Sequence, residues 1–535
     1  MTTAARKDHV TGPAFLLVAG RTVGLIVTFL IGPIFARLFS LEEIGTYKAF
    51  FLVYVTMYGL AQLGMAESLY YFVPRGAANV GRYVCNAALT LLVAGLACIV
   101  LLWGFRAPIA EFADNPALAD SMVLLGLFIT LTLVGTVLEI TMISRKQHMT
   151  AAITYALSDV ARTAFFIVPA MLFVSMRAVF LGAVIFAAMR LAMMLVVVWR
   201  QYGREFRPDP ALWRTQLAYA LPFAMAVGVD VVLINYHQYV VLGRFDPGQF
   251  AIYAIGVTSI PLVDLIMTST TSVMMVKMAE DSSDRHAALG LFHETVSRLT
   301  FLMMPLSLAL VALASPFIIT MFTVKFAASV PIFMIWALSI IPAVFAVDAM
   351  LRVYAQTRFL LVTNVVRLAF VVAFIAWFLG AFGAVGAVLV TLVAAFVGKG
   401  LGVVRIARLL QVPVREVLPW AAMGRITARA VAAAVPAWLV ARLLESMPPV
   451  ALVAGGAVYA ITYLVLCYAP GIAEPAAIRL PIMERIHRLR AGSAPRNAGS
   501  ASLNAGTAPR DPAYAFADGV GRVPRSGPAK AAGEI

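Results

Sequence analysis

The chain has 535 residues, of which 62% are hydrophobic and only 13% are charged, and its mean hydropathy is +0.91. A soluble domain carries roughly 25% charged residues, so this composition excludes a soluble enzyme or binding module and indicates a membrane protein. The net charge of +15 does not indicate nucleic-acid binding, because the basic residues are dispersed over short loops. The number and spacing of the cysteines argue against a disulfide framework or a metal site: Cys85, Cys98 and Cys467.

Apolar runs of about 20 residues, the length of a transmembrane helix, follow one another along most of the chain. The sequence therefore predicts an all-α polytopic membrane protein with about fourteen such helices. The expected spans are 13–38, 46–73, 82–105, 119–143, 151–174, 178–200, 213–242, 249–277, 289–314, 329–355, 359–380, 383–405, 428–445 and 449–469. The first run is longer than the apolar region of a signal peptide, roughly 7–15 residues, so it is predicted to be a retained helix.

Loop charges predict the orientation of these helices. Alternate loops hold most of the lysines and arginines, among them Arg145, Lys146, Arg200 and Arg204, whereas the loops of the opposite side hold few. Cytoplasmic loops of membrane proteins are enriched in Lys and Arg. Both termini are therefore expected in the cytoplasm, which agrees with an even number of spans.

Three short segments recur in the same order at a spacing of about 205 residues. The echoes are Arg37-Leu-Phe-Ser-Leu-Glu-Glu-Ile-Gly-Thr-Tyr47 with Arg244-Phe-Asp-Pro-Gly-Gln-Phe-Ala-Ile-Tyr253, Asp159-Val-Ala-Arg162 with Asn364-Val-Val-Arg367, and Leu181-Gly-Ala-Val184 with Val385-Gly-Ala-Val388. They predict two pseudo-symmetric six-helix lobes, related by an axis along the membrane normal, plus two extra C-terminal helices. The expected domains are 1–210 and 211–412 for the lobes, 413–490 for the additional helices and a basic segment, and 491–535 for a disordered cytoplasmic tail.

Ionisable residues interrupt the apolar runs. Each costs about 2.5–3.5 kcal/mol at the centre of a bilayer on the insertion scale. They are Arg21, Glu67, Glu139, Arg162, Arg190, Asp230, Asp264, Asp348, Arg352 and Arg367. Spread over many spans, they predict a hydrated polar space inside the bundle and indicate a protein that moves a charged or very hydrophilic molecule.

A purely structural role is the competing interpretation for some of these residues. Three pairs are spaced so that they can form an ion pair within one helix: Asp159 with Arg162, Glu294 with Arg298, and Asp348 with Arg352. His237 fits a packed core position as well as it fits proton coupling. Four residues have no obvious partner in their own helix and are predicted to line the cavity: Arg21, Glu67, Asp230 and Asp264.

No catalytic motif is present in the sequence: it contains no P-loop, no HExxH motif and no serine nucleophile elbow. No polar segment before the tail is long enough to form a domain that could bind ATP. The chain is therefore not expected to be an enzyme, and no cofactor is predicted. Transport would be driven by the membrane potential, an ion gradient or the gradient of the substrate itself.

The first two spans carry the residues of a family resemblance. Ala36-Arg-Leu-Phe-Ser-Leu-Glu-Glu-Ile-Gly-Thr-Tyr47, followed by Leu63-Gly-Met-Ala-Glu-Ser-Leu-Tyr-Tyr-Phe-Val-Pro74, resembles the polysaccharide-transporter branch of the multidrug/oligosaccharidyl-lipid/polysaccharide (MOP) superfamily. Phe382-Gly-Ala-Val-Gly-Ala-Val388 in the twelfth span is similar to that family as well. Leu41 replaces the proline that is common in the turn. The resemblance extends over residues 10–470 in topology.

The resemblance implies a V-shaped bundle that flips undecaprenyl-pyrophosphate-linked oligosaccharide across the bacterial cytoplasmic (inner) membrane by alternating access. The product would serve the synthesis of O-antigen, capsule or exopolysaccharide. Such a head group cannot cross hydrocarbon bare, because an isolated ion there costs tens of kcal/mol in the Born limit. The implied partners are the lipid-linked substrate, membrane lipids and polysaccharide assembly proteins, and the two additional helices would form an apolar groove for the polyprenyl tail.

Under this interpretation the charged residues divide into two groups. The arginines would contact the anionic head group: Arg21, Arg162, Arg190 and Arg367. The carboxylates would bind sugar hydroxyls or a coupling cation: Glu67, Asp230 and Asp264. Ion coupling is expected of Glu67 and Asp264, with His237 and Asp348 as further candidates.

Two rival functions are compatible with a polytopic bundle. A cation-coupled multidrug antiporter of the same superfamily would carry an acidic first helix, whereas the first span here contains Arg21 and no carboxylate. A membrane polysaccharide polymerase or ligase would need a large external loop, and no external loop between the expected spans exceeds about 15 residues.

Overall fold

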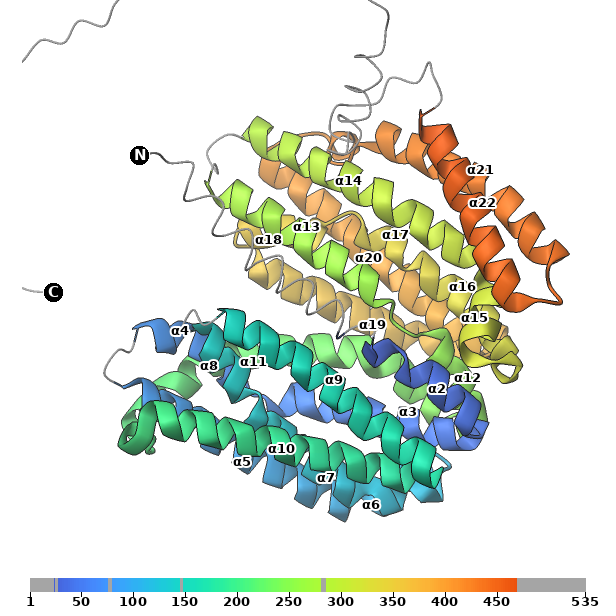
Figure 1. Ribbon diagram of the computed structural model, residues 1–535. Helices are drawn as coiled ribbons and strands as arrows, with labels where there is room; N and C mark the ends of the chain where they lie inside the picture. The colour runs from blue at the N-terminus through green and yellow to red at the C-terminus, as the bar shows by residue number, and fades with distance from the viewer. Residues whose placement is uncertain (1–23, 25–26, 76–78, 145–147, 281–284, 469–535) are drawn as a thin grey trace, which may run out of the picture. The chain divides into compact units, whose positions relative to one another are not determined.

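The computed structural model describes residues 24, 27–75, 79–144, 148–280 and 285–468. Within these residues the regular structure is entirely helical (Figure 1). The helices of the first half are α2 Ile31–Leu38, α3 Leu41–Ala61, α4 Met65–Arg75, α5 Val80–Gly104, α6 Arg106–Phe112, α7 Pro116–Gly135, α8 Val137–Ser144, α9 His148–Phe173 and α10 Met176–Tyr202. The expected tail, 491–535, lies outside the described residues.

The second half continues after the short 3-10 helix η1 Gly203–Glu205. Its helices are α11 Pro210–Leu242, α12 Pro247–Gly256, α13 Pro261–Glu280, α14 Arg285–Ala312, α15 Ala314–Phe322, η2 Val324–Ser329, α16 Val330–Leu338, α17 Ile340–Ala343, α18 Val347–Val353, α19 Thr357–Phe382 and α20 Ala384–Leu410. The chain then adds η3 Val414–Glu416, α21 Trp420–Leu443 and α22 Pro448–Tyr468.

Twelve helical segments of the described chain are long and apolar enough to cross a membrane. The first of the fourteen expected spans lies largely outside the described residues and is represented by the shorter apolar helix Val27–Leu38. The fifth corresponds to α9, which has 26 residues. The all-α multi-pass fold is thus confirmed, while the count of fourteen stays a prediction.

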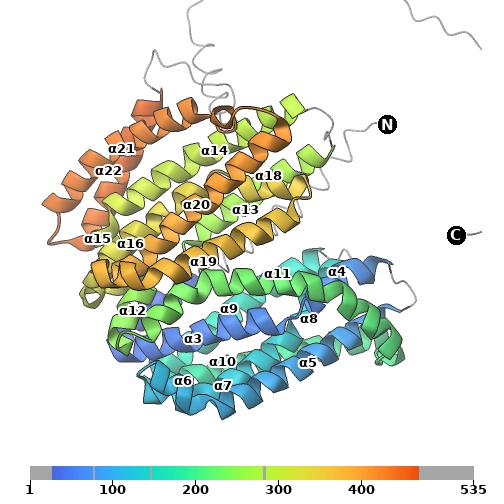
Figure 2. The same cartoon turned by 180° about the vertical axis from the view of Figure 1, so that it is seen from behind.

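The packing of the helices repeats between the two halves (Figures 1 and 2). In the first half, α9 packs against α2 and α10, α7 packs against α5 and α10, and α8 packs against α4. In the second half, α19 packs against α11 and α20, α16 packs against α14 and α20, and α18 packs against α13. Taken in chain order these are the same pairs, as a structural repeat between the two halves predicts. Helices α21 and α22 pack against each other and against α14 and α15, outside the repeat.

The first recurring motif begins a helix in each lobe. Ser40 caps α3 by accepting a hydrogen bond from the Glu43 backbone N–H at 3.2 Å, and the Glu43 carboxylate accepts from the Ser40 N–H at 2.9 Å. At the corresponding place Asp246 caps α12 by accepting from the Gln249 N–H at 2.9 Å, with Pro247 in the first turn. Caps of this kind satisfy backbone donors that a helix start otherwise leaves free. The motif therefore recurs because each lobe needs a helix start at the same point.

These two helix starts pack against each other. Gly45 on α3 lies against the backbone of Pro247, where a side chain would overlap the Pro247 carbonyl oxygen. Gly248 on α12 in turn lies against Leu41 of α3. A methyl group added at Gly248 would stand 3.5 Å from the Leu41 Cβ. A contact in which each partner presents the same patch is what a two-fold axis requires, so the pseudo-symmetry axis passes between α3 and α12.

Polar side chains also join the lobes at this end of the bundle. Arg37 at the end of α2 donates to the backbone carbonyl oxygens of Thr320 and Met321 in α15, both at 2.7 Å. Lys325 donates to the carbonyl oxygen of Phe39 at 3.0 Å. Each cation therefore satisfies carbonyl groups at a helix end of the opposite lobe, where helix carbonyls are left without intrahelical partners.

Helix α11 is the first helix of the expected second lobe, yet it contacts both lobes. It packs against α3, α4 and α5 as well as against α19 and α20. Asp209 caps its N-terminus and pairs with Arg82 of α5 at 2.9 Å, and the backbone of Asp209 exchanges two hydrogen bonds of 3.0 Å with the Asn86 side chain. The predicted boundary at residue 211 thus falls at a tightly held junction.

Replacing Gly45 by alanine should separate α3 from α12. Because the new methyl group overlaps the Pro247 backbone, we expect a loss of about 1–3 kcal/mol in stability, the usual cost of overpacking. Gly290→Ala in α14 is the matched control, since nothing lies within 4 Å of the added methyl group and alanine favours a helix. Thermal unfolding of the purified protein in detergent measures both. Equal melting temperatures for the two variants would contradict the close contact.

Acid should weaken the α5–α11 junction. The pKa of Asp209 is held below its ordinary value of 3.8, first by the hydrogen bond from the Leu212 backbone N–H and further by Arg82. A lowered carboxyl pKa stabilises the fold above the ordinary value, and the contribution disappears as the pH falls through the lowered value. Asp209→Asn should therefore melt earlier at neutral pH and lose less stability than the wild type below about pH 4. Melting temperatures between roughly pH 3 and 7 test this, with Glu416→Gln as an exposed control.

Candidate functional site

The candidate residues of the first lobe gather between α2, α3, α9 and α10. Arg162 pairs with Asp159 on the same helix at 2.9 Å, which confirms the predicted intrahelical pair. Arg162 also donates to the hydroxyl of Thr28, in the first helix, at 2.9 Å. Gly24 lies directly against the Asp159 side chain, and a methyl group there would stand 3.0 Å from the Asp159 Cβ. The first helix can approach α9 this closely because position 24 has no side chain.

Arg190 joins this group from α10. Arg162 and Arg190 both lie close enough to the Tyr54 hydroxyl to interact with it electrostatically. Arg190 is half-buried and lies beside Gly135, at the break between α7 and α8. A methyl group added at Gly135 would stand 3.9 Å from the Arg190 Cγ. We refer to these five residues as the first-lobe cluster: Thr28, Tyr54, Asp159, Arg162 and Arg190. Arg21, also predicted to contact the anionic group, lies outside the described residues.

The second lobe holds a corresponding group around Asn364. Asp230 of α11 accepts a hydrogen bond from the Asn364 side-chain amide at 3.3 Å, and Arg367 donates to the Asn364 amide oxygen at 3.4 Å. The Nε of Arg367 is buried and has no hydrogen-bond partner among the described residues. Gly398 of α20 makes room for this side chain, since a methyl group there would stand 3.0 Å from the Arg367 Cγ.

Asp348 completes this second group in a way that the sequence did not indicate. The predicted i,i+4 pair with Arg352 is wrong, because Asp348 instead binds Lys399 of α20 at 2.6 Å. Asp230 and Asp348 both interact electrostatically with Arg367 and Arg352. We refer to these six residues as the second-lobe cluster: Asp230, Asp348, Arg352, Asn364, Arg367 and Lys399.

Lys399 was missed by the sequence interpretation, although a signal was available. It stands between Gly398 and Gly400 within the apolar run of the twelfth span, where a lone cation requires a partner. Its side chain is only 15% exposed. The third predicted pair, Glu294 with Arg298 in α14, is confirmed as an intrahelical ion pair and contributes to neither cluster.

The two clusters occupy corresponding places. At the repeat spacing of 205 residues Asn364 corresponds to Asp159 and Arg367 to Arg162. In both lobes the polar contact joins the first helix to the fifth helix, and the fifth helix contributes an arginine three residues after the polar residue. The repeat detected in the sequence therefore reproduces a polar contact as well as a fold.

Glu67 and Asp264, the carboxylates predicted to couple ions, follow helix breaks. Glu67 lies in the first turn of α4, just after Leu63 and Gly64, whose φ angles are +48° and +65°. Asp264 lies in the first turn of α13, after the break between α12 and α13. Interrupted helices in corresponding positions of two repeats are where transporters bind ions and substrates.

The environments of these two carboxylates differ. One oxygen of Glu67, Oε2, is buried without a hydrogen-bond partner among the described residues, and the same holds for the side-chain oxygen of Gln216. The Gln216 amide group donates to Ser68, the residue after Glu67, at 2.8 Å. Asp264 is exposed and lines a small cavity of about 90 Å³ together with Trp336. Both carboxylates thus retain capacity to accept a proton, a cation or a hydroxyl group.

His237 lies apart from both clusters, in the packed core. Its Nδ1 is hydrogen-bonded to the Tyr253 hydroxyl at 2.5 Å, and its ring contacts Trp336 with centroids 6.1 Å apart. Only 3% of the residue is exposed. This environment favours the packed-core interpretation over ion coupling.

Comparisons with known proteins bear on the identity of this bundle. A family model described as polysaccharide biosynthesis protein matches residues 34–331. The structure of lipid II flippase MurJ in an inward closed conformation has a TM-score of 0.70 at 13% identity, over 85% of this chain and 98% of that chain. An outward-facing multidrug resistance MATE family transporter of the MOP superfamily has a TM-score of 0.51 at 14% identity, over 75% of this chain and 95% of that chain.

No curated protein sequence matches the chain, and at these identities the structural matches show the fold alone. The family model, however, covers more than half of the sequence. Since this match agrees with the motif resemblance, the chain belongs to the polysaccharide biosynthesis protein family, and its fold is similar to that of transporters of the MOP superfamily.

Proposed function

We propose that this transporter flips a polyprenyl-pyrophosphate-linked oligosaccharide by alternating access. The supporting observation is the charge of the two clusters. The first-lobe cluster brings together the guanidinium groups of Arg162, which pairs with Asp159, and of Arg190. The second-lobe cluster sets three cations, among them Arg367 and Lys399, against two carboxylates. The second-lobe cluster therefore has a formal excess of one positive charge, and together with the two arginines of the first-lobe cluster it suits the two negative charges of a pyrophosphate diester.

Arginine suits this task for a physical reason. A phosphate group that leaves water loses its hydration, and it recovers that energy only from charge-assisted hydrogen bonds. The guanidinium group presents its donors in a planar fork that fits phosphate oxygens. Arg367 retains a buried Nε–H without a partner, so it has a donor to offer. The polyprenyl tail would stay in the lipid while the head group moves between the lobes.

Alternating access would act through the joined end of the lobes. The contact of α3 with α12 and the hydrogen bonds of Arg37 and Lys325 hold the lobes together there. The loop charges predict that this end faces away from the cytoplasm. Substrate would enter from the cytoplasmic side of the bacterial inner membrane, with both termini on that side. Rocking of the lobes would break these contacts and release the head group to polysaccharide assembly proteins.

The rival functions fit the chain less well. A multidrug antiporter of the superfamily shares the fold, but the first span contains no carboxylate with which to bind a drug cation. A polymerase or ligase needs a catalytic domain, and none of the connections in the described chain forms a separate domain. A deletion strain that loses dye efflux while keeping normal surface polysaccharide would favour the antiporter.

Neutralising the arginines should abolish flipping. Because charge-assisted hydrogen bonds contribute about 1.5–3 kcal/mol each, Arg162→Gln and Arg367→Gln should each slow translocation by roughly tenfold or more. The measurement is the flipping of fluorescent lipid-linked oligosaccharide in proteoliposomes. Arg298→Gln is the matched control, since Arg298 belongs to neither cluster and forms an ion pair with Glu294 in α14. Unchanged flipping in both cluster variants at normal protein levels would defeat the proposal.

The carboxylates at the helix breaks should couple transport to an ion gradient. Glu67→Gln and Asp264→Asn keep the shape of the side chain but can no longer bind a proton or cation through a negative charge. We expect both variants to flip substrate at a rate that no longer responds to an imposed pH or sodium gradient. Glu294→Gln in α14 should keep the wild-type response. A full gradient response in both variants would rule out this role for them.

A further inference from the structure

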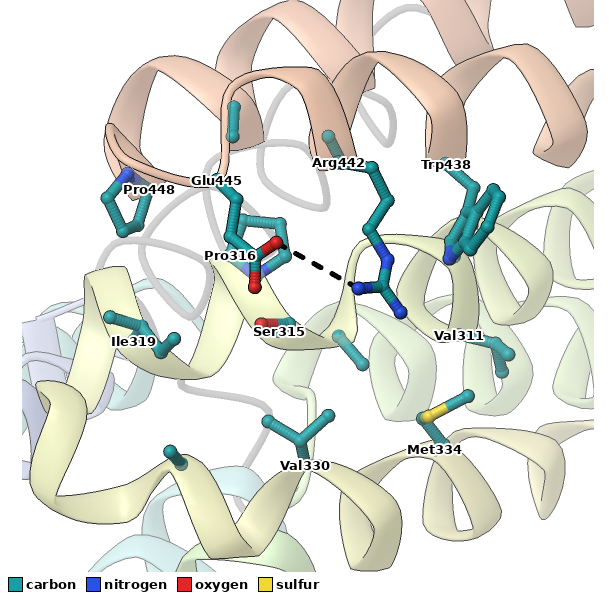
Figure 3. Close-up of a pocket in the computed structure, with 15 residues that line it drawn as sticks. Val311, Ser315, Pro316, Ile319, Val330, Met334, Trp438, Arg442, Glu445 and Pro448 are labelled. Carbon is teal, nitrogen blue, oxygen red and sulfur yellow. Dashed lines mark ion pairs between the residues drawn. The ribbon is translucent and has the colours of Figure 1, made fainter.

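A cavity of about 400 Å³ lies between the C-terminal helix pair and the second lobe (Figure 3). It shares no residue with either charged cluster. Its walls are mostly apolar side chains from α14, α15, α16 and the 3-10 segment before α16, such as Ile319, Val330 and Met334. Arg442 and Glu445 reach into it from the end of α21 (Figure 3). The cavity thus combines apolar walls with one charged rim.

The two charged groups at this rim are poorly satisfied by each other. The Arg442 Nη1 and the Glu445 Oε2 are 3.8 Å apart, whereas charge-assisted hydrogen bonds are about 2.7–2.9 Å long. The side chains are 63% and 68% exposed. Arg442 also lies over the Trp438 ring, 5.2 Å from its centroid. Both groups therefore keep hydrogen-bonding capacity for a ligand.

The position of the rim in the bilayer decides which ligand can reach it. α21 ends at Leu443 and α22 begins at Pro448, and both helices are long and apolar enough to cross a membrane. The rim therefore lies at the end of two spans, where tryptophan and arginine side chains sit at the level of lipid head groups. The apolar walls continue from this level into the hydrocarbon region. A molecule with a polar head and an apolar chain, already present in the membrane, fits this arrangement.

We propose that the cavity binds a phospholipid whose head group carries a phosphate and a primary ammonium, as in phosphatidylethanolamine. Arg442 binds the phosphate, Glu445 accepts hydrogen bonds from the ammonium, and the first part of an acyl chain lies on Val330 and Met334. Phosphatidylglycerol is disfavoured because its uncharged glycerol offers no cation to the Glu445 carboxylate, which is left close to the lipid phosphate. Choline lipids are disfavoured because a quaternary ammonium has no N–H to donate.

Lipid titration of the delipidated full-length protein tests this site. Native mass spectrometry in detergent compares dioleoyl phosphatidylethanolamine, phosphatidylcholine, phosphatidylglycerol and undecaprenyl phosphate. We expect the wild type to prefer phosphatidylethanolamine by about tenfold, the factor that one charged contact of about 1.4 kcal/mol provides. Arg442→Gln should weaken its binding by a similar factor. Glu445→Gln should remove the preference over phosphatidylcholine and raise the binding of phosphatidylglycerol.

Two further variants separate the site from general effects on folding. Ala327→Trp leaves the charged pair intact but fills the cavity from its exposed edge, so it should also lose the preference. Arg415→Gln with Glu416→Gln alters a similar pair, 3.7 Å apart and exposed, on η3 outside the cavity, and should leave the preference unchanged. Equal binding of all four lipids by the wild type would overturn the proposal. So would tighter binding of undecaprenyl phosphate that is insensitive to Glu445→Gln, which would assign the cavity to the substrate.

Discussion

A charged group at membrane depth is costly unless it has a partner inside the protein, and this constraint explains the main polar contacts of the interior. No water is available in the hydrocarbon region to satisfy an unpaired donor or charge. Arg162 therefore binds Asp159 and Thr28, and Lys399 binds Asp348 across two helices. These contacts also fix which helices are neighbours. The residues that recognise a polar cargo under the proposed function are thus the ones that hold each lobe in register.

In both lobes a polar contact joins the first helix to the fifth helix, but the residues that form it differ. In the first lobe the carboxylate, Asp159, lies on the fifth helix and the first helix offers the neutral Thr28. In the second lobe the carboxylate, Asp230, lies on the first helix and the fifth helix offers the neutral Asn364. The carboxylate has exchanged helices while the arginine has kept its place. Arg162 and Arg367 thereby each keep a carboxylate nearby.

Periodicity and run length predicted the parts of this fold that depend on one helix at a time. The spans, the repeat and the pair of Asp159 with Arg162 follow from spacing within the sequence. The partner of Asp348 could not be predicted in this way, because Lys399 is 51 residues away and only packing brings α18 to α20. The helix breaks were missed because run length does not register them, although Gly64 and Pro261 stand at the two breaks and both residue types interrupt helices.

The arrangement also explains how binding would move the lobes under the proposed function. Under that proposal the arginines of the two lobes would repel each other as the lobes approach, and an anion between them would remove this repulsion. A ligand shifts a conformational equilibrium only by the difference in its affinity for the two states. A pyrophosphate that contacts one cluster in one state and both clusters in the other would bind the second state more tightly. The hydrogen bonds of Arg37 and Lys325, which oppose the motion at the joined end, have charged donors and contribute about 1.5–3 kcal/mol each. Several contacts of the same kind to one pyrophosphate head group are of comparable size and can offset them.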